Sequence, residues 1–189
     1  MSLREQKQRE TRLRIAETAM GLFLEHGYDG TTLDAIAAAA RISRRTFFSY
    51  YKSKEDIVLA WQEAAWQAIW DELRTVSPDQ PPLEAVRDLL IKHAARYEAD
   101  ELKATDRVMR SNETLMARKQ AAFAMQEEAL YGVLCEVWRQ PHRRPSLRIV
   151  AMVALGTLRL AIKEYGEQDG ARPASSYLQE AFAQLEAEI

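Results

Sequence analysis

The sequence contains a single cysteine, Cys135, in 189 residues, so no disulfide forms within the chain. A lone thiol is typical of proteins in a reducing compartment, and we expect a cytoplasmic location. No apolar run approaches the roughly 18 residues that cross a bilayer. The polar segment MSLREQKQRE also lacks the apolar core of a signal peptide. These absences predict a globular protein without a membrane span or a disulfide framework.

Motifs of common enzyme classes are also missing. The sequence has no glycine-rich phosphate loop and no Gly-x-Ser-x-Gly nucleophile motif. A di-iron bundle needs Glu-x-x-His pairs, and no glutamate stands three residues before His26, His93 or His142. Cys135 and His142 alone do not make a zinc site. We therefore expect neither a cofactor nor a metal, and no enzyme. Two other classes stay open as alternatives to the function argued below: a helical-bundle enzyme, and an interaction protein without DNA specificity.

The net charge of -2 hides an asymmetry along the chain. Residues 1–55 hold ten Lys and Arg against seven Asp and Glu, a balance of +3. Residues 56–189 hold sixteen against twenty-one, a balance of -5. Numbers this small also arise by chance. The alternative is a cationic domain at 1–55 that binds an anionic partner, followed by an acidic domain at 56–189 with a different function.

Apolar residues recur at intervals of three and four, and no strand-like alternation or Asn-Gly hairpin signal occurs. The sequence therefore predicts an all-α fold. A first helix ends at Gly27, a short one follows Thr31 or Thr32, a third runs from 44 to 51, and Ser53 caps a fourth. The breaks SPDQPP and RQPHRRP separate the remaining helices. They are predicted at 82–97, 102–109, 112–138, 145–165 and 174–188, which makes about nine in all.

The stretch RISRRTFFSYYKSKED, residues 41–56, places two aromatic doublets among five cations. On a helical wheel Phe47 and Tyr51 share one side, while Phe48 lies beside Arg44. One ring of each doublet is thus predicted to enter the core, and the opposite face presents guanidinium groups, a phenyl ring and hydroxyls. Guanine, thymine methyl groups and phosphates are partners for such a face. Short helices with surface arginines are common, but the order of short helix, tight turn and short helix favours a helix-turn-helix.

Residues 13–59, LRIAETAMGLFLEHGYDGTTLDAIAAAARISRRTFFSYYKSKEDIVL, resemble the N-terminal domain of TetR-family transcriptional regulators. The resemblance implies a three-helix DNA-binding domain, followed by a larger helical domain for effector binding and dimerisation. It implies a homodimer on a palindromic double-stranded operator, usually a repressor, that a small-molecule effector releases. Two positions depart from the family pattern. Arg41 stands where glycine is usual in the turn, which costs about 1 kcal/mol at positive φ, and Phe48 stands where tyrosine is frequent.

The resemblance also implies the residues that contact DNA. Those on the second and third helices and at the start of the fourth are Thr32, Ser43, Arg44, Arg45, Thr46, Phe48, Ser49, Tyr50 and Lys54. Arg44, Arg45, Phe48 and Ser49 are expected to face bases or their flanking phosphates.

The C-terminal part of the sequence is less specific. Candidates for effector binding are Trp66, Trp70, Arg96, Met109, Asn112, Met116 and Phe123, although core packing explains each apolar one at least as well. The last two helices carry broad apolar stripes, and a helix that is apolar on two faces packs on two partners. Residues expected at the dimer interface are Leu155, Leu158, Leu178, Phe182 and Leu185.

Overall fold

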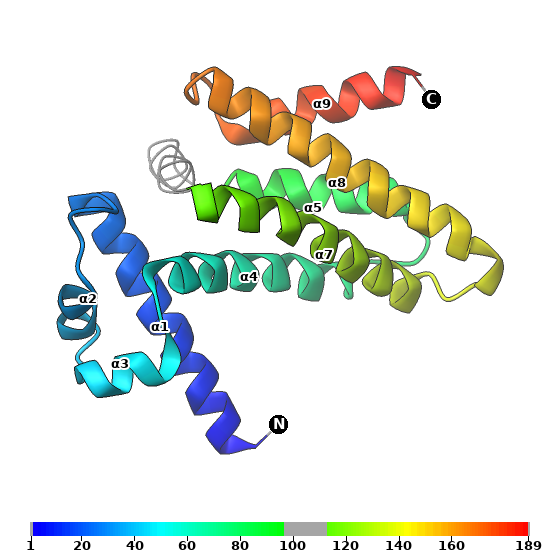
Figure 1. Ribbon diagram of the computed structural model, residues 1–189. Coiled ribbons are helices and arrows are strands. Elements are labelled where there is room, and N and C mark those ends of the chain that lie inside the picture. The colour runs from blue at the N-terminus through cyan, green and yellow to red at the C-terminus, as the bar shows by residue number, and fades with distance from the viewer. Residues whose placement is uncertain (1, 97–112, 189) are drawn as a thin grey trace. The chain divides into compact units, whose positions relative to one another are not determined.

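The computed structural model describes residues 2–96 and 113–188, and all regular structure in these residues is helical (Figure 1). This confirms the predicted all-α class. Contacts divide the described chain into two compact units. The first holds residues 2–65 and 113–116, and the second holds 66–96 and 117–188. The division falls within α4 (Lys54–Leu73), whereas the sequence placed the boundary at the start of that helix.

The first unit begins with α1 (Leu3–His26), whose ends are set by local chemistry. The Ser2 hydroxyl accepts a hydrogen bond from the Glu5 amide, and the Glu5 carboxylate accepts one from the Ser2 amide. This capping box starts the helix at Leu3. The helix ends where Gly27 takes a φ of 78°, in the region that glycine enters without steric cost. The predicted end of this helix is therefore confirmed.

Two short helices complete the first unit, α2 (Leu33–Ala39) and α3 (Arg44–Tyr50). Of the two threonines offered as caps, Thr32 caps α2, because its hydroxyl accepts a hydrogen bond from the Ala35 amide at 3.1 Å. Thr31 is buried instead and donates to the Gly27 carbonyl at 2.8 Å. The core between these helices and the start of α4 is apolar. It includes Ile15, Ala19, Phe23, Ile36, Phe47, Tyr51 and Ile57.

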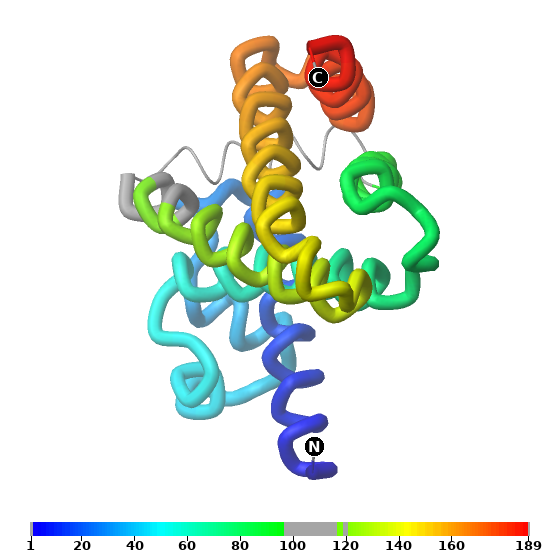
Figure 2. The backbone as a smooth tube through the Cα atoms, turned by 90° about the vertical axis from the view of Figure 1, so that its right-hand side faces the viewer, coloured from blue at the N-terminus to red at the C-terminus, as the bar shows by residue number. Residues whose placement is uncertain are grey.

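The second unit contains the rest of α4 with α5 (Pro82–Ala94), α7 (Glu113–Val137), a 3₁₀ turn η1 (Pro141–Arg143), α8 (Arg144–Glu167) and α9 (Ala174–Glu188). These bounds confirm the predicted helices around 112–138, 145–165 and 174–188. The helix expected at 82–97 ends at Ala94. The helix expected at 102–109 lies outside the described residues. Figure 2 shows α8 and α9 as neighbours at the C-terminal end of the chain.

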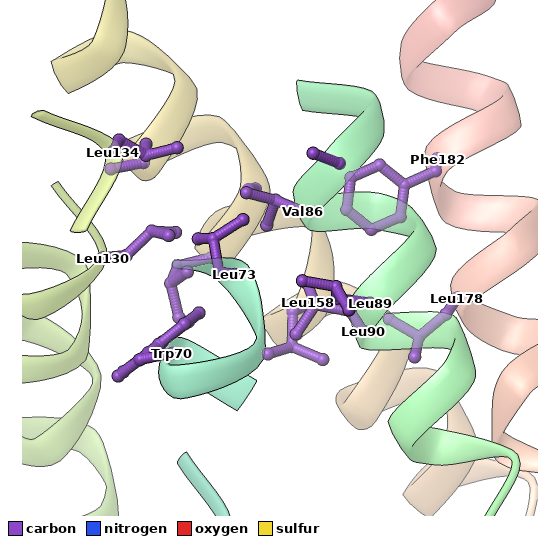
Figure 3. Close-up of a cluster of buried hydrophobic side chains, with 14 of the residues drawn as sticks. Trp70, Leu73, Val86, Leu89, Leu90, Leu130, Leu134, Leu158, Leu178 and Phe182 are labelled. Carbon is purple, nitrogen blue, oxygen red and sulfur yellow. The ribbon is translucent and has the colours of Figure 1, made fainter. Parts of the chain in front are cut away.

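The second core joins all five α-helices of this unit. Figure 3 shows Trp70 and Leu73 of α4 and Leu130 and Leu134 of α7 around the same cluster as Val86 of α5. Leu158 of α8 and Phe182 of α9 belong to the same cluster. A burial this extensive, at about 25 cal/mol per Å² of apolar surface, is the main stabilising contribution to the unit.

Two tryptophans anchor this core through their indole nitrogens. Trp138, 1% exposed, donates to the carbonyls of Pro78 at 2.9 Å and Gln80 at 3.1 Å, which fixes the loop between α4 and α5. Trp70 donates to the Gln126 side chain at 2.9 Å. Its ring stacks on that of Trp66 with centroids 5.2 Å apart and planes 19° apart.

The helix α8 is apolar on two opposite sides, and the residues predicted for the dimer interface lie on the side that faces the core of the protomer. Leu155 and Leu158 of α8, with Leu178 and Phe182 of α9, are at most 6% exposed because they fill the core of their own protomer. Leu185 packs against the same cluster. Leu185 is only half-buried. The segment Pro141–Glu167 is also long and apolar enough to span a membrane by length and composition, a test that core helices pass as well.

The opposite side of α8 remains exposed. Ile149 is 60% exposed, Met152 53% and Leu160 65%. Their spacing of three and eight residues places them on one face of the helix, which we call the outer stripe of α8. The sequence identified both apolar sides of α8, and its choice of interface residues stays a prediction.

Candidate nucleic-acid interface

The turn between α2 and α3 holds Arg41 at a φ of 55°. The amide of Arg41 donates to the Ala38 carbonyl, and the amide of Ile42 to the Ala37 carbonyl, both at 3.0 Å. These are the two hydrogen bonds of a Schellman motif, which ends a helix with one left-handed residue. Arginine therefore occupies the position where glycine is favoured, as the sequence indicated, and the turn is formed without adjustment.

A second arginine holds this turn from α1. The guanidinium of Arg14 donates to the Ala40 carbonyl at 2.8 Å. Ala40 is the C-cap residue of α2, so the contact satisfies a helix end and ties the turn to α1. Sequence reasoning missed Arg14 because no local pattern links two residues 26 positions apart.

Side-chain caps set the start of α3. The Ser43 hydroxyl accepts from the Thr46 amide at 3.0 Å and lies 2.8 Å from the Thr46 hydroxyl. The Ser49 hydroxyl donates to the Thr46 carbonyl at 2.6 Å. All three hydroxyl residues are exposed, so they remain accessible on the surface of α3. The cap orients the first turn of the helix, where two arginines stand.

The aromatic doublets split as predicted. Phe47 is fully buried and Tyr51 is 1% exposed, whereas Phe48 is 42% exposed. The Tyr51 hydroxyl donates to the Arg12 carbonyl at 2.9 Å, and the Arg12 guanidinium lies 5.0 Å from the ring centre. Burial raises the pKa of Tyr51, while Arg12 opposes that rise. Tyr51 therefore stays a neutral donor that fastens α3 to α1.

Two guanidinium groups emerge beside the exposed ring. Arg44 donates to Asp34 at 3.2 Å, and its guanidinium lies 5.8 Å from the Phe48 ring centre. Both partners of this ion pair are more than half exposed, so the pair contributes little and exchanges readily for another anion. Arg45 is exposed and has no carboxylate partner among the described residues. The face around Phe48 is thus cationic, with an apolar centre.

Lys54 begins α4 and is engaged by the same unit. Its ammonium donates to the Tyr28 carbonyl at 2.7 Å and lies 4.4 Å from the Tyr28 ring centre. The Tyr28 hydroxyl in turn donates to Glu55 at 2.8 Å. Burial raises the pKa of Tyr28, and the Glu55 carboxylate raises it further, so the phenol keeps its proton. An ammonium has three donors, which leaves Lys54 able to bind a phosphate as well.

Tyr50, the last residue of α3, is half-buried and lies apart from the exposed arginines. It lines a groove of about 610 Å³ against the first turns of α1. The other lining residues are Leu3, Arg4, Lys7, Gln8 and Thr11. The sequence predicted only Tyr50 in this region. The cations at positions 4 and 7, on one helical face, were the available signal.

The predicted effector residues fall into three groups. Trp70 is buried in the core of the second unit, and Trp66 and Phe123 pack against that core. Arg96 is exposed, 3.7 Å from the Glu72 carboxylate. Met109, Asn112 and the Met116 side chain lie outside the described residues.

Most of the first unit matches a known family of domains. Residues 15–61 match the family model of the bacterial regulatory proteins of the tetR family. The N-terminal domain belongs to the TetR family. The matched residues contain α2, the Schellman turn and α3, and they leave out the first turns of α1.

Relatives of this TetR-family domain are regulators. The chain is 34% identical over 104 residues to the HTH-type transcriptional regulator TcmR of Streptomyces glaucescens, over 55% of this chain and 46% of TcmR. It is 32% identical over 79 residues to the negative regulator of the biofilm operon, IcaR, of Staphylococcus epidermidis, over 42% and 43%. The match thus spans about half the length of these curated relatives.

Solved structures extend the likeness to the whole fold. FadR of Thermus thermophilus, a TetR-family repressor solved with lauroyl-CoA, is 25% identical with a TM-score of 0.61 over 92% of each chain. A transcriptional regulator of Aquifex aeolicus is 21% identical with a TM-score of 0.61, over 95% of this chain and 99% of that one. The second unit therefore has the fold that accompanies this domain in both.

Proposed function

We propose that the chain is a sequence-specific DNA-binding transcriptional regulator that works as a homodimer on a palindromic operator. One observation carries this proposal: the exposed face of α3 groups Arg44, Arg45 and Phe48 over a fully buried Phe47. The buried ring fixes the helix, and the exposed groups match the acceptors and methyl groups of a major groove. The regulators among its relatives support the same conclusion.

Each residue has a role in this proposal. Arg44 and Arg45, in the first turn of α3, donate to guanine O6 and N7 or to flanking phosphates. Phe48 contacts a thymine methyl group. The hydroxyl residues and Lys54 hold the sugar–phosphate backbone and set the register of the helix. The hydroxyl residues in this set are Thr32, Ser43, Thr46, Ser49 and Tyr50.

Dimerisation follows from the outer stripe of α8. A single helix-turn-helix reads few base pairs, and two modules joined on one DNA gain affinity through effective concentration. The two half-sites are related by the dyad of the DNA, so the partner is a second copy of the chain. The apolar face consists of Ile149, Met152 and Leu160, and each of these side chains is more than half exposed. A second copy of the chain covers this face. This stripe replaces the interface residues that the sequence suggested.

A small-molecule effector that binds the second unit and releases the DNA completes the proposal. FadR was solved with an acyl-CoA and is a repressor, and IcaR is a negative regulator, which favours repression here too. Trp66, Phe123 and Arg96 are the candidates within the described residues, and Met109, Asn112 and Met116 are candidates outside them. As a regulator of this kind the protein is cytoplasmic and is not an enzyme.

The test is selection of binding sites from a random DNA pool, first with the native chain and then with Arg45→Ala. We expect a palindromic consensus for the native chain. The variant should lose one base preference in each half-site and about 1–3 kcal/mol of binding free energy per half-site. A pool from which the native chain enriches nothing contradicts the proposed function. An unchanged consensus with the variant removes only Arg45 from base reading.

Lys54→Ala is the matched control for that experiment. Its contact is assigned to a phosphate, so affinity should fall alike for all sequences and the base consensus should stay. The slope of log affinity against log salt should fall by roughly one unit for each contact removed. A changed consensus with an unchanged slope would assign Lys54 to a base instead.

A further inference from the structure

The groove between the first turns of α1 and the end of α3 is built from chemistry that suits a phosphodiester. Arg4, Lys7, Gln8 and Thr11 follow a spacing of three, one and three residues, so they share one face of α1. Tyr50 closes the groove from α3. The capping box at Ser2 continues α1 far enough to hold this face in helical form. Figures 1 and 2 both show the first turns of α1 extending past α3.

The cations in this groove are free to bind an anion. Neither Arg4 nor Lys7 forms an ion pair with a carboxylate of the described residues, and both are exposed. Gln8 and the Tyr50 phenol add neutral donors beside them. The Thr11 hydroxyl donates to the Lys7 carbonyl at 2.9 Å, so Thr11 lines the groove without adding a free donor. Two charges with neutral donors along an open groove match an extended chain of phosphates.

The position of the groove beside α3 indicates that the anion is the backbone of the same DNA that α3 contacts. Tyr50 is the last residue of α3, so the groove adjoins the end of the helix opposite Arg44 and Arg45. A DNA strand whose bases meet the first turn of α3 continues past the last turn. Residues 3–11 also precede the segment matched by the TetR-family model. The α1 side of the groove thus lies outside the matched segment, and Tyr50 lies within it.

We propose that this groove binds the sugar–phosphate backbone of the operator outside the base pairs that α3 reads, with Arg4 and Lys7 on phosphates. The proposal rests on the proposed function, because it assumes that α3 lies on DNA. It extends the footprint of each protomer without adding base specificity. It also makes part of the affinity depend on flanking DNA of any sequence.

The test compares Arg4→Gln/Lys7→Gln with Arg9→Gln on the selected operator, over salt from 50 to 200 mM. Arg9 lies on the same α1 turns, is exposed and does not line the groove, so it shows the effect of removing one cation from these turns outside the groove. Loss of two phosphate contacts should lower the salt slope by about 1.8 per protomer. The affinity advantage of the native chain over the double variant should then shrink by about 12-fold per protomer across that fourfold salt range. The selected consensus should not change.

A second arm shortens the DNA instead of the protein. Duplexes that end at the last selected base pair are compared with duplexes extended by about 10 base pairs on each side. The native chain and Arg9→Gln should bind the longer duplex more tightly, whereas the double variant should not distinguish the two. An equal salt slope for the double variant and Arg9→Gln overturns the groove assignment, as does a native chain indifferent to flank length. If the native chain selects no site at all, the proposed function itself fails.

Discussion

The two units of the chain use their charged residues in different ways. Residues 2–65 contain ten Lys and Arg, and only Arg44 among them pairs with a carboxylate of the described residues. In the second unit, seven form such pairs. They are Arg74, Arg87, Lys92, Arg96, Arg148, Lys163 and Arg172.

This difference separates two kinds of surface. Cations without carboxylate partners keep a positive potential that attracts a polyanion and is screened by salt. Paired cations are neutralised, and the second unit instead exposes the apolar outer stripe of α8. One unit is thus suited to nucleic acid and the other to a protein surface. Net charge alone hides this, because the balances of +3 for residues 1–55 and -5 for residues 56–189 nearly cancel.

The largest expected effect comes from Leu160→Glu. A charge in the outer stripe of α8 must be buried when two copies meet, so the dimer should dissociate into folded monomers. Operator affinity should fall by about 10²–10⁴-fold, because the avidity of two joined modules is lost. Sedimentation gives the mass of the variant, and circular dichroism reports its fold.

Phe182→Glu is the contrasting variant. It places a charge in the protomer core, where Phe182 is fully buried, so it should unfold the second unit. A folded, dimeric Leu160→Glu would move the interface away from the outer stripe of α8. A folded, monomeric Phe182→Glu would restore the interface that the sequence suggested.

Glu72→Ala should destabilise the second unit by about 1–2 kcal/mol, because buried His93 loses its hydrogen-bond partner. The Glu72 carboxylate lies 2.7 Å from the His93 ring nitrogen, and it also accepts from Lys92. Urea unfolding measures the loss. Glu180→Ala, which breaks only the exposed pair with Arg172, is the control and should cost less.

The effect of Glu72 should depend on pH. Hydrogen bonds from Lys92 and then His93 lower the pKa of Glu72 below its ordinary value. A carboxylate with a depressed pKa stabilises the fold above its unfolded pKa, and this contribution disappears as the pH falls through the folded pKa. The gap in unfolding free energy between native chain and variant should therefore narrow in acid. A gap that widens in acid would contradict this assignment.

Arg41→Gly should stabilise the first unit by up to about 1 kcal/mol, since glycine removes the strain of a side chain at positive φ. Arg41→Ala keeps the Cβ atom and should show no such gain. The midpoints of thermal unfolding compare the two variants. A gain that is equal in both would mean that the guanidinium, not the backbone, causes the cost.

Arg172→Gln should have the smallest effect on DNA binding. Its charge is already paired with Glu180 in the second unit, so the salt slope should match that of the native chain. The same titrations used for Lys54→Ala provide the measurement. A salt slope lowered by about one unit would contradict the difference between the two units, because it would place a cation of the second unit on DNA.

Much of the first unit was predictable because its signals are local. Caps at Ser43 and Thr32, the glycine after α1 and the spacing of Phe47 and Tyr51 each act within a few residues. Contacts between distant segments were not predictable. Arg14 on the Ala40 carbonyl and Lys54 on Tyr28 depend on packing that no periodicity encodes.

The second unit was harder to interpret for a related reason. Its helix bounds follow from prolines and apolar spacing, and they were largely correct. The side of α8 that faces its own core was not encoded in that spacing, since Leu158 and Leu160 are equally apolar. Only the positions of α5 and α9 decide which leucine is buried. An effector site likewise depends on how several helices meet, which single-helix patterns do not specify.

The stacked indoles of Trp66 and Trp70 give the second unit an optical signature. Two identical chromophores 5.2 Å apart and inclined by 19° couple their electronic transitions, so they should absorb polarised light as a pair. The far-ultraviolet circular-dichroism spectrum then contains an exciton couplet that either tryptophan alone would lack. Because both rings belong to α4, any rotation of one turn of that helix changes the couplet without a label. The chain thus contains its own spectroscopic reporter, which includes Trp66, one of the proposed effector residues.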